Sequence, residues 1–258
     1  MSLDGLMENK FVLGLLLSAG AGLSTTVGSL IGLAVKKPGP KFLSFTLGFS
    51  AGVMILVSFV ELLAKAIESI GFVPAHMGFF GGMIAYFLID LLIPHDYSGQ
   101  HDHPESVSDE GLMRTSLLVA LGIGIHNFPE GMASFVGTLQ KPELGVAIAI
   151  AIAIHNIPEG LAVSAPVYLA TGSRSKAFLW SFLSGVSELV GAGIAALVLW
   201  PILNDTVLGW VLSAVGGIMV AISLDELMPT AKSMYEGHIP ILGAILGMMI
   251  MAASLAML

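Results

Sequence analysis

One hexapeptide occurs twice in this chain, and its residue types are those that bind metal ions. It reads HNFPEG over residues 126–131 and HNIPEG over residues 155–160. Five of the six letters are identical, and the second copy follows the first by 29 residues. Chance repetition of so unusual a string is remote, so we interpret the two copies as halves of one site.

The spacing within each copy predicts a metal site. On a helix, a histidine and a glutamate four positions apart share one face, so each copy offers an imidazole and a carboxylate to the same point. The asparagine is rotated by about 100° and reaches a second, adjacent point. This donor set suits a divalent transition metal such as zinc or iron. The candidate ligands are His126, Asn127, Glu130, His155, Asn156 and Glu159.

The other motif residues fit a helix within a membrane. Pro129 and Pro158 remove a backbone hydrogen bond and free the carbonyls of Ile125 and Ile154. Irregular backbone is tolerated at that depth where it lines a protein-buried or wet cavity. The glycine that ends each copy allows close helix approach.

The composition excludes several classes of protein. Of the 258 residues, 55% are hydrophobic and 11% are charged, whereas soluble domains carry about 25% charged residues. The mean hydropathy is +0.91. With a net charge of −8, the chain lacks the basic footprint of a nucleic-acid-binding protein. It has no cysteine, which excludes a disulfide scaffold and a thiolate metal site.

Eight apolar runs are long enough to cross a membrane, which takes about 20 residues. They predict an all-α polytopic membrane protein that forms one transmembrane domain over residues 1–258. The first run is too long for the core of a signal peptide, so we expect a retained helix. The two motifs lie near mid-membrane on antiparallel helices, because their midpoint falls in the break after the fourth run. The runs are Phe11–Val35, Phe42–Ile70, Val73–Pro94, Leu112–Leu139, Leu144–Ala170, Ala177–Trp200, Val207–Met228 and Ile239–Leu258.

The distribution of basic residues predicts the orientation. Connections one, three, five and seven hold seven of the ten lysines and arginines. By the positive-inside rule these connections face the cytoplasm, and both termini face outside.

Further acids lie within or near the ends of the apolar runs. A charged side chain at the bilayer centre costs about 2.5–3.5 kcal/mol on insertion scales, which favours a functional role. We expect Glu188, the most isolated of these acids, to face the motif helices. Those near span ends are either vestibule groups or solvated helix-end charges. The acids concerned are Glu61, Asp90, Glu188, Asp225 and Glu226.

The polar connection at about residues 95–111 carries His95, His101 and His103 beside aspartates. Histidines in such a tract can capture metal loosely on the predicted cytoplasmic side. A solvated linker that happens to be polar is an equally good interpretation, and both stay open.

Taken together, the paired motifs, eight spans, outside termini and histidine-bearing third connection resemble the ZIP family of divalent metal transporters. The strings LGFSAGVM (47–54), PVY (166–168) and SLDELMP (223–229) resemble its bacterial zinc and iron uptake branch. The resemblance covers essentially the whole chain.

The resemblance implies uptake of zinc, and often of iron, manganese, cobalt or cadmium, into the cytoplasm without a prosthetic group. It implies a bacterial inner-membrane protein, often dimeric, with helices arranged 3+2+3 and the outer triplets related by an inverted repeat. His126, Glu130, His155 and Glu159 would hold one metal ion.

The same resemblance implies a second, adjacent metal position held by Asn127, Asn156 and Glu188, with the two motif glutamates able to bridge. Met54 matches a position that adds a thioether ligand in some members. Residues that would line the path on either side are Asp90, Asp225, Glu226 and Glu61.

Two functions from other classes remain as alternatives. An intramembrane metal hydrolase could use a zinc ion with an open position to activate water. It is disfavoured because the chain has no His-Glu-x-x-His motif. A metal-sensing receptor would bind metal without flux, and it predicts a signalling domain.

Overall fold

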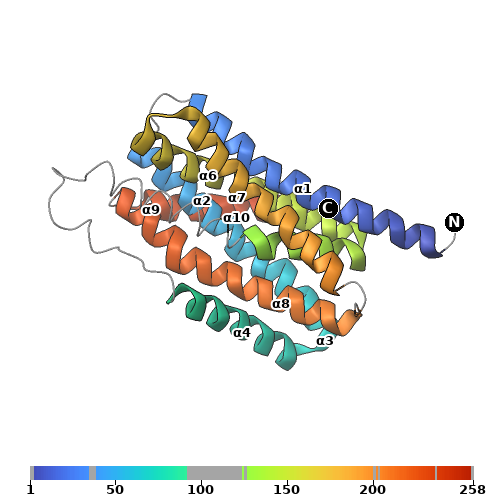
Figure 1. The fold of residues 1–258 in the computed structure, drawn as a ribbon. Helices are drawn as coiled ribbons and strands as arrows, with labels where there is room; N and C mark the ends of the chain where they lie inside the picture. Colours follow the sequence, from blue (N-terminus) through green and yellow to red (C-terminus); the bar gives the residue numbers. More distant parts are fainter. Residues whose placement is uncertain are drawn as a thin grey trace.

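The computed structural model is a bundle of long helices (Figure 1). It describes residues 3–34, 39–91, 124, 127–199, 202, 204–235 and 237–256. Over these residues the predicted all-α fold is confirmed. Six helices are long and apolar enough to cross a membrane, and Ile239–Leu255 is a shorter apolar helix. The chain is therefore an integral membrane protein with several spans.

Seven of the eight predicted runs correspond to described helices, and of the remaining one, Leu112–Leu139, only residues 124 and 127–139 are described. Two spans contain a wider π-helical turn in mid-course, at Ser58–Leu63 and Ser223–Leu227, and a third ends in one, at Ala195–Leu199. A further helix, of which residues 127–140 are described without a break, carries the first motif. The remaining helices are α1 (Leu3–Ala34), α2 (Pro40–Val57), α3 (Ala64–Ile70), α4 (Phe72–Asp90), α6 (Pro142–Thr171), α7 (Arg174–Ile194), α8 (Asp205–Ile222), α9 (Met228–Met234) and α10 (Ile239–Leu255).

Ordinary capping signals set the helix ends. The side chains of Ser173 and Asn204 accept hydrogen bonds from the backbone N–H groups at the starts of α7 and α8. Gly172 ends α6 with a φ of 62°, a conformation that glycine adopts without the steric cost of a Cβ atom. Gly71, with a φ of 85°, separates α3 from α4.

The seventh span differs from its prediction. It was expected to end at Met228, but helix continues through Pro229 to Met234, so Lys232 lies within helix. The wide turn over Ser223–Leu227 immediately precedes this proline. The wide turn accommodates this proline in mid-helix, since a proline lacks the N–H that a regular α-helix would use there and its ring crowds the preceding turn.

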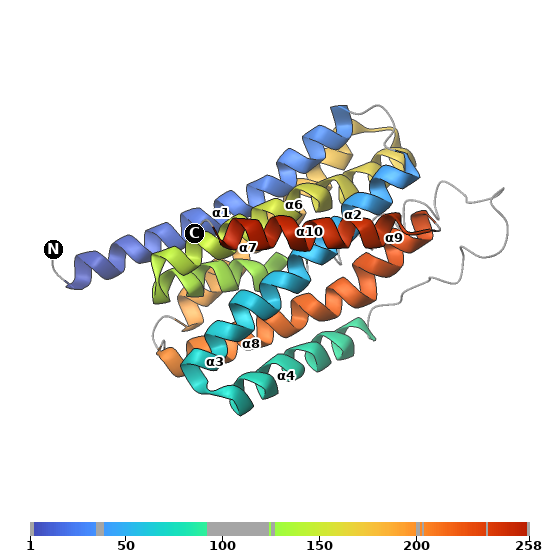
Figure 2. The ribbon, with the colours of Figure 1, turned by 180° about the vertical axis from the view of Figure 1, so that it is seen from behind.

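The helices pack in two groups. In one, α1 packs against α6 and α7, and the helix over residues 127–140 joins them. In the other, α2 packs against α10, and α4 against α8. Figure 1 and Figure 2 show α4 and α8 side by side at one edge of the bundle, with α1 at the opposite edge. Contacts between α2 and α6 join the two groups. Residues on the facing sides of these two helices therefore lie at the boundary between the groups.

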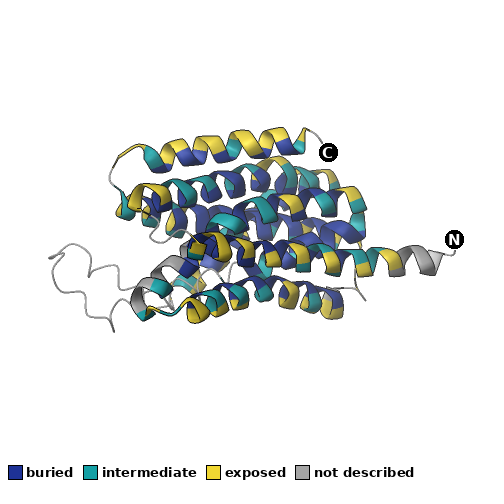
Figure 3. Cartoon of the chain, turned by 90° about the horizontal axis from the view of Figure 1, so that it is seen from above, coloured by how far each residue is buried: buried dark blue, intermediate teal, exposed yellow. Residues whose placement is uncertain are grey.

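Burial follows from this arrangement. Large apolar side chains are exposed on the outer faces of α4 and α10, as at Phe80 and Met249. Figure 3 shows such exposed residues turned outward and buried residues turned toward the interior. The start of α1 and the end of α10 lie at the same end of the bundle (Figure 2).

Glycines bring the helices of each group into backbone contact. A Cβ atom added at Gly82 of α4 would lie 2.1 Å from the carbonyl oxygen of Ala214 on α8. One added at the neighbouring Gly81 would meet nothing within 4 Å. The two positions therefore separate the effect of close packing from that of helix propensity.

We expect Gly82→Ala to destabilise the protein by about 1–3 kcal/mol, the usual cost of forcing an extra carbon into a packed interior. Gly81→Ala should be neutral or stabilising by up to about 1 kcal/mol, because alanine favours helix. Thermal unfolding of both variants in one detergent checks this. Equal melting temperatures would contradict the tight α4–α8 contact.

Candidate metal centre

The polar residues of the two motifs lie in the interior of the bundle. Pro142–Thr171 is a single helix that carries the second motif through Pro158, and the first motif lies on the helix over residues 127–140. Glu188 comes from the middle of α7. The side chains with 0% exposure are Asn127, Glu130, His155, Asn156, Glu159 and Glu188.

His155 links the two motif helices. Its Nδ1 lies 2.9 Å from the carbonyl oxygen of Ala151, one turn earlier on α6, and can donate a hydrogen bond to it. Its Nε2 lies 3.1 Å from Oε1 of Glu130 on the other motif helix. Donation from Nδ1 to a backbone carbonyl fixes the ring and leaves Nε2 to bind a metal ion. The imidazole and a carboxylate of the opposite copy thus meet at one point.

Glu159 is held from the second group of helices. Ser50 of α2 has its Oγ 3.0 Å from the carbonyl oxygen of His155 and 3.3 Å from Oε1 of Glu159. Its hydroxyl can donate to either acceptor. The sequence analysis did not identify Ser50 as a site residue. A signal was present, because Ser50 lies four positions before the candidate Met54 and so shares its face of the helix.

The two asparagines and Glu188 form the adjacent part of the cluster. Asn156 Nδ2 donates to Oε1 of Glu188 and, over 3.0 Å, to the carbonyl oxygen of Ala21. Asn127 Nδ2 donates over 3.2 Å to the carbonyl oxygen of Ser184. Glu188 therefore does face the second motif.

Several buried oxygens of this cluster lack a hydrogen-bond partner among the described residues. Leaving a buried polar atom unpaired costs about 1–3 kcal/mol, so these oxygens indicate a ligand. Carboxylate and amide oxygens suit a divalent cation, which would compensate the burial of their charge. The atoms are Oδ1 of Asn127, Oε2 of Glu130, Oδ1 of Asn156 and Oε2 of Glu188.

Within the part of the chain that the structure describes, no three His, Asp or Glu side chains gather tightly enough to hold one ion. The cluster consists instead of two linked pairs, His155 with Glu130 and Asn156 with Glu188. His126 lies outside the described residues.

The remaining candidates lie on helices other than α6, α7 and the helix over residues 127–140, or outside the described residues. Met54 is fully buried on α2, one turn after Ser50. The acids expected along the path stand on the π-helical turns and at a helix end: Glu61 on Ser58–Leu63, Asp225 and Glu226 on Ser223–Leu227, and Asp90 at the end of α4. His95, His101 and His103 fall outside the described residues.

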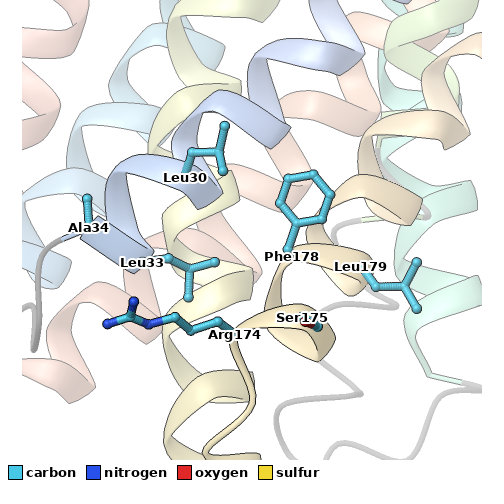
Figure 4. A pocket seen from close by; sticks show the side chains of 7 residues that line it. All are labelled: Leu30, Leu33, Ala34, Arg174, Ser175, Phe178 and Leu179. Carbon is cyan, nitrogen blue, oxygen red and sulfur yellow. The ribbon is translucent and has the colours of Figure 1, made fainter.

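A surface groove between the end of α1 and the start of α7 contains none of the candidate ligands (Figure 4). Its lining is mostly apolar, with Arg174 as its charged member. The residues that line it are Leu30, Leu33, Ala34, Arg174, Ser175, Phe178 and Leu179.

The fold and the buried cluster define a class: a polytopic membrane protein with metal-binding residue types in its interior. Comparison with known families assigns it further. The profile of the family described as "ZIP Zinc transporter" matches residues 94–255. The chain belongs to the ZIP zinc transporter family.

Curated relatives match nearly the whole chain. The zinc transporter ZupT of Oceanobacillus iheyensis is 48% identical, with 98% of this chain and 100% of the relative covered. ZupT of Chlorobium chlorochromatii is 50% identical over 96% of this chain and 98% of its own. ZupT of Escherichia coli O127:H6 is 42% identical over 95% of this chain and 96% of its own.

We expect Ser50→Ala to weaken metal binding about fivefold, because the hydrogen bond that holds Glu159 contributes about 1 kcal/mol. Equilibrium titration of the purified protein with Zn²⁺ measures this. Ser58→Ala is the matched control, since its buried hydroxyl donates over 2.7 Å to Met54 of the same helical run. Wild-type affinity in Ser50→Ala would mean that the hydroxyl does not position the carboxylate.

Proposed function

We propose that this chain transports divalent zinc ions across the membrane into the cytoplasm. The carrying observation is the buried junction of the two motif helices, where Nε2 of His155 lies 3.1 Å from Oε1 of Glu130. The names of the curated relatives support zinc as the substrate. We extend the proposal to iron, manganese, cobalt and cadmium, because mixed nitrogen and oxygen ligands serve them too.

In this proposal the protein replaces the water around the ion with its own side chains. His155, Glu130 and Glu159, together with His126, hold one ion, and Glu188 with the two motif asparagines holds an adjacent one. The carboxylates offset the cost of removing the ion from water. The charge of the ion in turn compensates the burial of the acids.

Loading and release then require relative movement of the two helix groups. Glu130, His155, Glu159 and Glu188 are fully buried in this structure, so we expect an ion to reach them when the groups part. The motif helices belong to one group, and Ser50 contacts Glu159 from the other. Exposing the centre first to one side and then to the other would carry the ion across.

We also propose the 3+2+3 arrangement with an inverted repeat. Matching contacts support it: a Cβ atom at Gly52 would lie 2.0 Å from the oxygen of Ala244, and one at Gly217 would lie 1.9 Å from that of Phe79. Each partner in the second contact is displaced by 165 positions from its equivalent in the first. The step also relates Glu61 to Glu226, both on π-helical turns.

Zinc uptake into liposomes that hold the purified protein, read with an internal dye, tests the transport proposal. We expect saturable uptake that falls by at least about tenfold in Glu130→Gln and His155→Ala, since even residues that merely orient metal ligands cost 10–100-fold. Glu143→Gln is the control, because Glu143 is exposed in the first turn of α6.

Comparing two pH gradients would show whether protons move with the metal. Absent flux, with metal still bound and a lipid or peptide cleaved, would overturn the transporter and favour the intramembrane hydrolase. Metal binding without flux or cleavage would favour a receptor.

We propose further that the protein lies in a bacterial inner membrane with both termini outside, which labelling can test. The chain has no cysteine, so single cysteines can be placed at Ser175 and Thr206, exposed residues that begin α7 and α8. In intact cells a membrane-impermeant maleimide should label Thr206→Cys, and it should label Ser175→Cys only after permeabilisation. The reverse labelling pattern would mean that both termini face the cytoplasm.

A further inference from the structure

The crossing of α1 and α7 is nearly symmetric. Gly22 and Gly185 face each other there: a Cβ atom on Gly22 would lie 2.3 Å from the oxygen of Gly185, and one on Gly185 would lie 2.2 Å from that of Gly22. These two glycines are 163 positions apart. The same step relates other residues of α1 to residues of α7.

Contacts to the two motif helices come in pairs that follow this step. Ser18 Oγ of α1 lies 3.0 Å from the carbonyl oxygen of Gly14 and 3.2 Å from that of Gly131, which ends the first motif. Ser181 Oγ of α7, 163 positions later, lies 3.2 Å from the carbonyl oxygen of Thr25 and 3.4 Å from that of Gly160, which ends the second motif. Each motif glycine thus lies beside a serine hydroxyl of a different partner helix.

The same pairing relates Thr25 to Glu188. A Cβ atom on Gly131 would lie 1.8 Å from the backbone oxygen of Glu188, and one on Gly160 would lie 1.8 Å from that of Thr25. The side chains correspond as well, since a Cβ atom on Gly22 would lie 3.5 Å from Cβ of Glu188, and one on Gly185 would lie 3.3 Å from Cβ of Thr25. Thr25 thus takes on α1 the place that Glu188 takes on α7.

The hydrogen bonds of the motif asparagines are related by the same step of 163 positions. Asn156 donates to the carbonyl oxygen of Ala21, and Asn127 donates to that of Ser184, 163 positions later. Asn156 also donates to Glu188. By the same relation, Thr25 belongs beside Asn127.

The hydroxyl of Thr25 is one of three on α1, with those of Thr26 and Ser29, that are buried and unpaired among the described residues. Thr25 has 0% exposure, yet its Oγ1 has no hydrogen-bond partner among the described residues. Buried hydroxyls in helices commonly donate to the carbonyl four residues earlier, as Thr138 does over 2.7 Å. Oxygens of Asn127, Asn156 and Glu188 are likewise buried and unpaired among the described residues.

We propose that Thr25 is a further residue of the second metal position, where its hydroxyl supplies a neutral oxygen to the bound ion opposite the carboxylate of Glu188. This proposal rests on the proposed transport function. With threonine on α1 and glutamate on α7, these two helices together present one carboxylate to the ion instead of two. A divalent ion then binds without the added attraction of a second buried acid, which would slow its release.

Equilibrium binding of Zn²⁺ to the purified full-length protein tests the proposal. Thr25→Val keeps the side-chain shape and removes the hydroxyl, so we expect one zinc position to weaken about tenfold, as the loss of one polar contact of about 1.4 kcal/mol would do. Thr25→Ser should bind as the wild type does. Thr138→Val, which loses a hydroxyl bonded within its own helix, should also bind normally.

Thr25→Cys provides a second test, which does not depend on whether Thr25→Val is stable. Thiolates prefer soft ions, and the chain has no other cysteine. We expect Thr25→Cys to show an ultraviolet thiolate-to-cadmium charge-transfer band that saturates with one Cd²⁺, and Thr138→Cys to show none. The band should weaken in Thr25→Cys combined with Glu188→Gln.

Normal zinc binding in a folded Thr25→Val, or cadmium bound by Thr25→Cys without the band, would overturn the role of Thr25. Failure of the transport function looks different, since wild-type protein would then move no zinc. Transport that is lost in Glu130→Gln but normal in Thr25→Val and Thr25→Cys would reject this inference and leave the transport function standing.

Discussion

The structure depends on one constraint: acids and an imidazole are buried where the membrane excludes water. An unpaired charge at that depth is costly, so each ligand needs a hydrogen bond, an oppositely charged neighbour or a bound cation. His155 and Glu130 meet one another, and Glu188 accepts from Asn156. The oxygens that remain unpaired are those that a divalent ion would compensate.

Bringing these side chains together requires that helix backbones touch. Gly131 packs on Glu188, Gly160 packs on Thr25, and both contacts are closer than any Cβ atom would permit. The glycine of each motif is thus part of the geometry of the centre, because it sets the depth and distance of the ligands one residue before it. The proposed transport cycle also requires the ligand-bearing group of helices to move relative to the other group, and in the described part of the chain α6 contacts that other group mainly through α2.

Structural features that depend on residues close together in the sequence could be predicted from it. Apolar length gave the spans, and the spacing of histidine and glutamate placed both on one helix face. Ser50 and Thr25 were missed because a buried hydroxyl has no periodicity of its own, and its role depends on which helix lies opposite. The repeat that relates α2 to α8 does leave a signal in the sequence, which includes neither Ser50 nor Thr25: Gly52, Met54, Ser58, Glu61 and Leu62 recur as Gly217, Met219, Ser223, Glu226 and Leu227.

The near-symmetry also shows how one helical scaffold could hold the two unequal metal positions proposed above. Backbone contacts are repeated almost unchanged by the 163-position step, because glycine contacts admit little variation. Side chains on that frame are free to differ, as they do where α7 has Glu188 and α1 has Thr25. A transporter must release what it binds, so a frame that could place two carboxylates opposite each other and places only one favours passage over storage.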